Sequence, residues 1–93
     1  MEIKKSDGKF YVGDHPEEPL AEMTITLKGP KQLIIHHTMV SDEWRGQGVG
    51  DMLLEEVVSY ARESNRQIIP LCPFAKARLE KNRRQYEDVL KVK

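Results

Sequence analysis

The chain's 93 residues fit one domain, residues 1–93, and leave little room for a second. Its 15 basic and 15 acidic side chains cancel, so no global field favours nucleic acid or an anionic membrane as a partner. No apolar run approaches the roughly 18 residues that cross a bilayer, and the first residues lack the apolar core of a signal peptide, so we expect a cytoplasmic protein.

The first 40 residues have the pattern of antiparallel strands. Met1 to Val12 alternates weakly around Asp7-Gly8, which is a plausible two-residue hairpin turn. From Leu20 to Lys28 apolar and polar residues alternate cleanly, which predicts a strand with one buried side.

The strand predicted from Gln32 to Val40 is rich in β-branched residues. Strict alternation places Leu33, Ile35, His37 and Met39 on one face and Ile34, His36, Thr38 and Val40 on the other. Because both faces are largely apolar, we expect a central strand that is covered on both sides.

Helical spacing follows, with apolar residues recurring from Val49 through Arg62. Gln67 to Cys72 predicts a short strand, and its proline indicates a sheet edge or an irregular end. A second helix is predicted from Ala75 to Asn82, and Tyr86 to Val92 either continues it or forms a short third helix. The fold class is therefore α/β, a compact sandwich whose mixed sheet is mostly antiparallel, with two or three helices.

A glycine-rich turn lies between the central strand and the first long helix. It reads Arg45-Gly46-Gln47-Gly48-Val49-Gly50. Glycine permits positive φ and close backbone approach, and amides at a helix N-terminus attract anions, so the turn suits a phosphate. The spacing fits neither a dinucleotide fingerprint nor a P-loop. On spacing alone, a flexible turn without a ligand explains the glycines equally well.

Several separated motifs resemble those of GNAT-type N-acetyltransferases, in particular the minimal, YjdJ-like branch. The resemblance covers about residues 20 to 90. Its motifs are His36-His37-Thr38-x-Val40, Trp44-Arg45-Gly46-Gln47-Gly48-Val49-Gly50, Tyr60-Ala61-Arg62 and Ile69-Pro70-Leu71-Cys72-Pro73-Phe74.

The resemblance implies a compact GNAT-like sandwich that uses acetyl-coenzyme A as co-substrate and no metal. The strand ending at Val40 would splay from the strand ending at Cys72, and the pantetheine arm would lie in the gap. The resemblance assigns the pantetheine to the main chain of Thr38, Met39 and Val40. It assigns the pyrophosphate to Arg45, Gly46, Gln47, Gly48, Val49 and Gly50.

Two side chains are candidates for the chemistry. An unperturbed histidine titrates near neutrality, so His37 suits a general base by residue type, although a histidine bonded within the core explains it equally well. Cys72 is the only cysteine, which rules out an internal disulfide. Its thiol would accept the acetyl group or protonate the departing thiolate; the alternative is a small buried residue. The tyrosine acid of many GNAT enzymes is in doubt, because Arg78 stands where the minimal branch often has an aromatic residue.

The leading hypothesis is an N-acetyltransferase acting on an amine acceptor, which is a protein lysine or a small amine. A coenzyme A-binding sensor or accessory module without catalysis is the alternative, and a structural domain without a ligand is a third. The chain has no room for the elements from which larger GNAT enzymes build acceptor pockets. The acceptor site is then open, completed by a second copy in a homodimer, or absent.

Overall fold

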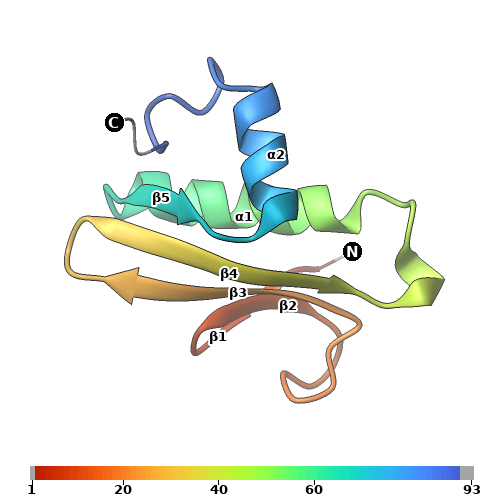
Figure 1. Ribbon diagram of the computed structural model, residues 1–93. Helices are drawn as coiled ribbons and strands as arrows, with labels where there is room; N and C mark the ends of the chain where they lie inside the picture. The colour runs from red at the N-terminus through yellow and green to blue at the C-terminus, as the bar shows by residue number, and fades with distance from the viewer. Residues whose placement is uncertain (1, 91–93) are drawn as a thin grey trace.

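The computed structural model describes residues 2–90, which form one five-stranded sheet with two α-helices packed on the same face (Figure 1). The strands lie in chain order across the sheet, and neighbours run antiparallel except for the parallel pair β4 and β5. Their bounds are β1 Lys4–Ser6, β2 Lys9–Val12, β3 Ala21–Lys28, β4 Gln32–Val40 and β5 Gln67–Pro70. The predicted α/β class and the mixed sheet are confirmed.

The helical elements follow the predicted order. A short 3-10 turn, η1 (Asp42–Trp44), leads to α1 (Val49–Glu63), and α2 (Pro73–Lys81) follows β5. The apolar residues of α1 recur every three or four positions, so one face of the helix, which includes Leu53 and Val57, is buried against the sheet. Each such fully buried side chain stabilises the fold by about 1.5–3 kcal/mol.

Strand β4 carries a β-bulge at His36. Thr24 of β3 pairs with His37, and the next residue, Ile25, pairs with Ile35, so His36 has no partner of its own. The extra residue is accommodated on the polar side, where His36 Nε2 lies 2.7 Å from the hydroxyl of Thr26. A bulge reverses the alternation of every residue beyond it.

Because of the bulge, the residues of β4 after His36 lie on the opposite faces of the sheet from those that strict alternation predicts. Val40 packs against the core that contains Ile35, and Thr38 pairs with core residue Met23, so both lie on the helix-covered face. His37 is exposed. The expectations that His37 shares a face with Ile35 and that both faces of the strand are covered are therefore wrong.

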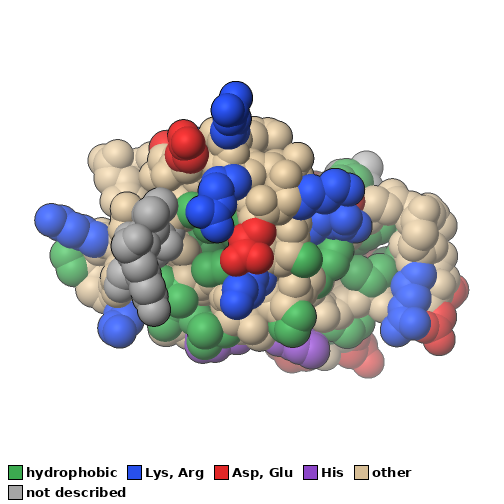
Figure 2. All heavy atoms as spheres, turned by 45° about the horizontal axis from the view of Figure 1, so that its top comes forward, with side chains coloured by type: hydrophobic (Ala, Val, Ile, Leu, Met, Phe, Trp, Pro, Cys, Tyr) green, Lys and Arg blue, Asp and Glu red, His purple; other side chains and the backbone are tan. Residues whose placement is uncertain are grey.

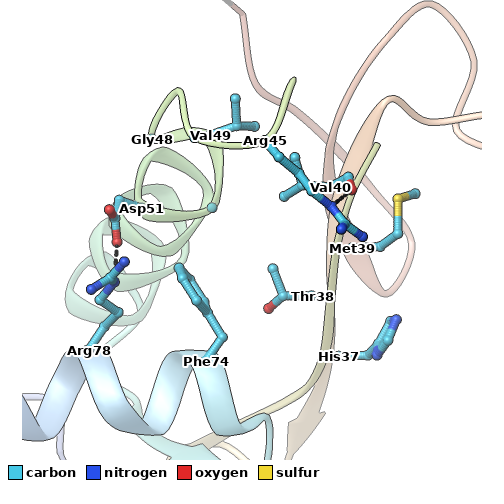
Figure 3. A pocket seen from close by; sticks show the side chains of 12 residues that line it. His37, Thr38, Met39, Val40, Arg45, Gly48, Val49, Asp51, Phe74 and Arg78 are labelled. Atoms are coloured by element: carbon cyan, nitrogen blue, oxygen red, sulfur yellow. Dashed lines mark hydrogen bonds and ion pairs between the residues drawn. The ribbon is translucent and has the colours of Figure 1, made fainter. Parts of the chain in front are cut away.

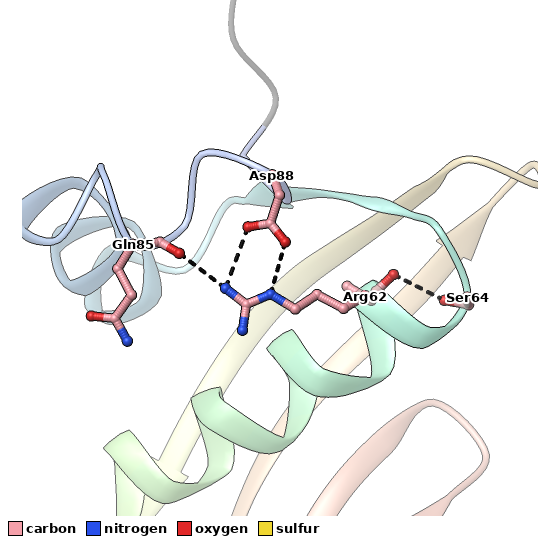
Figure 4. A network of polar contacts seen from close by, with 5 residues as sticks. Arg62, Ser64, Gln85 and Asp88 are labelled. Carbon is pink, nitrogen blue, oxygen red and sulfur yellow. Dashed lines mark hydrogen bonds and ion pairs between the residues drawn. The ribbon is translucent and has the colours of Figure 1, made fainter.

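The segment after α2 packs along α1 through polar contacts to two side chains of that helix, Glu55 and Arg62. The hydroxyl of the buried Tyr86 donates to the Glu55 carboxylate. Arg62 binds the carboxylate of Asp88 at 2.8 Å and the carbonyl of Gln85 at 2.9 Å (Figure 4). These contacts hold the segment after α2 in place, although its sequence has only weak apolar periodicity.

No third α-helix is present among the residues described. Residues 82–89 are turns, and Leu90 forms an isolated bridge to Ile68. The remaining part of the segment predicted as Tyr86 to Val92 lies outside residues 2–90. Within that range, neither helix is long and apolar enough to span a membrane. On the face drawn in Figure 2, acidic and basic side chains are interspersed rather than segregated.

Candidate cofactor-binding site

The edge of β4 that faces β5 is free beyond Ile35. Strand β3 pairs with β4 as far as Val40, whereas β5 pairs with it only as far as Ile35. Strand β5 ends at Pro70, which has no amide hydrogen with which to extend the ladder. The amides of Leu71 and Cys72 then both donate to the Ile35 carbonyl, at 3.0 and 3.2 Å, where the chain turns into α2. The rest of β4 thus has no strand partner on this side within the described chain.

A cavity of about 660 Å³ opens where the two strands diverge. This volume lies in the range of small-molecule sites, about 300–1,000 Å³. The surface is visibly hollowed beside a projecting turn (Figure 2), and the lining side chains come from β4, the glycine turn, α1 and α2 (Figure 3). The lining residues are His37, Thr38, Met39, Val40, Arg45, Gly46, Gly48, Val49, Gly50, Asp51, Phe74 and Arg78.

The cavity gathers most of the residues predicted from the sequence. Two candidates do not line it. Gln47 turns its amide toward the carbonyl of Glu43, at 3.2 Å, and Cys72 is buried behind the cavity wall. Three lining residues, Asp51, Phe74 and Arg78, were not predicted. The spacing of the last two, one helical turn apart on α2, is the signal that places them on one face.

The glycine turn presents main-chain groups at the start of α1. Gly46 and Gly48 have φ values of 78° and 77°, in the left-handed region that favours glycine. Gly48 is the N-cap residue of α1, and no side chain caps the first turn. The first amides of a helix have no partner within the helix and carry the positive end of its dipole, so this turn is suited to an anion.

Arg45 adds a cation at the mouth of the cavity. Its Nε lies 3.3 Å from the Asp42 carboxylate and 3.4 Å from the Val40 carbonyl. The side chains of Arg45 and Asp42 are 72% and 90% exposed, and surface ion pairs of this kind contribute little to stability. The guanidinium can therefore exchange its partner for a bound anion.

Cys72 joins the cavity through Thr38. The thiol is 4% exposed, and its Sγ lies 3.2 Å from Thr38 Oγ1, with either atom able to donate. Cys72 is also the N-cap of α2, with Pro73 next in the helix. Thr38 lines the cavity and Cys72 does not, so within the described chain the thiol is connected to the cavity lining through the Thr38 hydroxyl.

His37 lies at the border of the cavity. Its side chain points away from Thr38 and Phe74, toward the face of the sheet that the helices leave open (Figure 3). The carbonyl of His37 accepts a 3.4 Å hydrogen bond from Thr24 Oγ1. The exposed ring is accessible to a molecule that approaches from that open face, which a core histidine would not be.

Arg78 reaches from α2 to the first turn of α1. Its Nε lies 2.8 Å from Asp51 Oδ1 without an aligned hydrogen bond, so the contact is an ion pair. The guanidinium carbon also lies 5.1 Å from the ring centroid of Phe74. The two side chains of α2 together form the wall of the cavity opposite β4 (Figure 3).

Comparisons with known proteins show which family model and which solved structures the chain resembles. A family model described as GCN5-related N-acetyl-transferase matches residues 9–89. The NMR solution structure of a GCN5-like protein from Staphylococcus aureus is 49% identical and superimposes with a TM-score of 0.80, over 97% of this chain and 87% of that chain. An integron cassette protein from V. cholerae shares the fold at 22% identity and a TM-score of 0.50, over 91% of this chain and 54% of its own length. Among curated proteins, none matches the chain.

Proposed function

The chain belongs to the GCN5-related N-acetyltransferase family, and on that premise we propose that it binds acetyl-coenzyme A and transfers the acetyl group to an amine. One observation carries the proposal. The free edge of β4 and the uncapped first turn of α1 meet in a single cavity. A free strand edge suits the amides of a pantetheine arm, and an uncapped helix start suits a diphosphate, so the two features match the two halves of one ligand.

Each half of the cofactor has its own set of residues in this proposal. The main chain of Thr38, Met39 and Val40 binds the pantetheine arm as an added strand, with the Val40 amide directed at the thioester oxygen. The amides of the glycine turn, residues 46–50, hold the diphosphate, and Arg45 adds charge-assisted hydrogen bonds. Gln47 contributes through its main chain, because its side chain is turned to Glu43.

The chemistry is direct transfer. The amine nitrogen bonds to the acetyl carbon as the carbon–sulfur bond breaks, the amine loses a proton, and the departing thiolate gains one. We assign the first proton to His37, whose exposed ring lies on the open face from which an acceptor has access. We assign the second to the Thr38 hydroxyl, which the thiol of Cys72 resupplies across 3.2 Å.

A binding module without catalysis is the second candidate. Two observations favour it: the His37 side chain points away from the cavity, and the Cys72 thiol is buried behind Thr38. Such a module would report the level of coenzyme A or acetyl-coenzyme A to a partner rather than consume it.

Calorimetric titration with acetyl-coenzyme A tests the binding proposal. Micromolar affinity is expected, and no heat at millimolar ligand would refute it. Release of free coenzyme A is then followed with lysine peptides and small polyamines as acceptors. Acceptor-dependent release identifies the transferase, whereas tight binding without release across the panel identifies the binding module. Sedimentation of the cofactor-bound protein shows whether it forms the homodimer that a shared acceptor site would require.

A further inference from the structure

We propose that Arg78 enables the start of α1 to accept a diphosphate by neutralising the carboxylate of Asp51. This inference rests on the function proposed above, since it concerns the same cavity. It assigns Arg78 as a positioning residue that acts through Asp51, rather than as a direct ligand of the phosphates.

Asp51 is placed unfavourably for an anion site. It lies in the first turn of α1, beside Gly50, and it lines the cavity. A carboxylate in the first turn stabilises a helix whose amides are free, because it interacts favourably with the positive end of the dipole. The same charge repels a second anion at that turn, so Asp51 opposes the binding of a diphosphate.

Arg78 offsets this charge from the other helix. Its Nε lies 2.8 Å from Asp51 Oδ1, and its guanidinium is held beside the ring of Phe74, 5.1 Å from the centroid. The side chains of Arg78 and Asp51 are 44% and 53% exposed, so the pair faces the cavity without being sealed in the core. The cation therefore cancels the carboxylate where the phosphates are expected.

The other cation at the glycine turn, Arg45, does not neutralise Asp51. Arg45 already has a carboxylate neighbour, Asp42, at 3.3 Å. Of the two ion pairs at this site, Arg45–Asp42 and Arg78–Asp51, loss of Arg78 would leave one cation and two carboxylates, with a net charge of −1. With Arg78 the net charge of the two pairs is zero. The positive end of the α1 dipole then determines the electrostatic potential at the turn.

Binding of acetyl-coenzyme A to four proteins tests the inference: wild type, Arg78→Gln, Asp51→Asn and the double variant. We expect Arg78→Gln to raise Kd roughly tenfold, because it leaves the carboxylate uncompensated. Asp51→Asn should bind at least as tightly as wild type. The double variant should return to within about twofold of wild type, since in both proteins this pair of positions carries no net charge.

Two further measurements separate this role from simple packing. Arg78→Lys keeps the charge and should retain affinity within a few-fold. Acetyl-pantetheine, which lacks phosphates, should shift the NMR signals of wild type and Arg78→Gln at similar concentrations. A double variant as weak as Arg78→Gln, an Arg78→Gln variant that binds like wild type, or an equal loss for acetyl-pantetheine would each overturn the inference. If wild type itself does not bind acetyl-coenzyme A, the proposed function fails first, so the two failures are distinguishable.

Discussion

The ring of Phe74 occupies the space that a side chain at Gly50 would need. A Cβ built on Gly50 would lie 2.8 Å from Phe74 Cζ and 3.2 Å from Cε2, closer than carbon atoms approach without a shift. Gly50 has no positive φ, so its small size serves helix packing rather than backbone conformation. The turn's glycines therefore differ in purpose: Gly46 and Gly48 shape the chain, and Gly50 makes room for the cavity wall.

We predict that Gly50→Ala preserves stability and weakens the cofactor site. Alanine gains roughly 0.8–1 kcal/mol of helix propensity over glycine, which offsets the cost of moving the outer end of one half-buried ring. The displaced ring of Phe74 narrows the cavity, so the affinity for acetyl-coenzyme A should fall while the melting temperature changes little. Combining Gly50→Ala with Phe74→Leu should restore affinity. Unchanged binding by Gly50→Ala alone would show that the ring moves away from the ligand.

Gly48→Val should abolish binding of acetyl-coenzyme A. A Cβ at Gly48 meets no described atom within 4 Å, so the added group would occupy open space at a residue that lines the cavity, where we place the diphosphate. A β-branched residue at a φ of 77° also costs about 1–3 kcal/mol of stability.

Gly29→Val is the matched control, because Gly29 has a φ of 60° and equally open space in the β3–β4 turn, outside the cavity. Calorimetry and thermal unfolding of both variants should show similar losses of stability and a loss of binding only for Gly48→Val. A folded Gly48→Val protein with native affinity would contradict the placement of the diphosphate.

The pair of Arg62 and Asp88 should stabilise the fold in a pH-dependent way. The hydrogen bond from Arg62 lowers the pKa of Asp88 below its ordinary value of 3.8. A lowered folded pKa means that the contribution is present above pH 3.8 and is lost as pH falls through the folded value. Because the side chains are 40% and 56% exposed, we expect no more than about 1 kcal/mol.

Urea unfolding of wild type and Arg62→Met at pH 7 and at pH 2–3 measures this contribution. The difference in free energy of unfolding should be present at pH 7 and should shrink in acid. Arg45→Met is the control, since the more exposed pair of Arg45 and Asp42 should leave stability unchanged. A difference between wild type and Arg62→Met that is constant with pH would assign the loss to packing of the side chain.

Tyr86 should titrate at high pH. Burial, followed by the hydrogen bond to Glu55, raises its pKa from 10.0 to about 12. A raised folded pKa gives stability that is fully present below pH 10 and is lost as pH rises through about 12. The absorbance of ionised tyrosine should therefore show a late phase, which Tyr86→Phe removes and Tyr60→Phe retains. A late phase that survives in Tyr86→Phe would contradict the assignment.

Local patterns predicted the elements but not the contacts between them. The periodicity of residues 49–62 and the alternation of residues 20–28 depend only on nearby residues, and both elements formed close to the predicted bounds. The bulge at His36 arises from the register between β3 and β4, which no single-strand pattern contains. Because His36 is the extra residue of the bulge, His37 lies on the open face of the sheet rather than on the face of Ile35.

The same reasoning applies to the candidate site. The glycine turn is a continuous motif, so the sequence identified it. Asp51 and Arg78 meet only because α2 crosses the start of α1, which depends on where Pro70 ends β5. Burial of Cys72 behind Thr38 is likewise a property of the packed fold.

The contact between Cys72 and Thr38 allows the thiol's role to be tested. If the thiol resupplies a proton through the hydroxyl, Cys72→Ala and Thr38→Val should each lower kcat, and the double variant should lose no more than the worse single variant. Cys72→Ser keeps a donor at the same place and should recover part of the rate. If the thiol instead accepts the acetyl group, mass spectrometry of wild type mixed with acetyl-coenzyme A will show an acetylated Cys72. Full turnover by Cys72→Ala would remove the thiol from either mechanism, and would leave it as a small buried residue beneath the cavity wall.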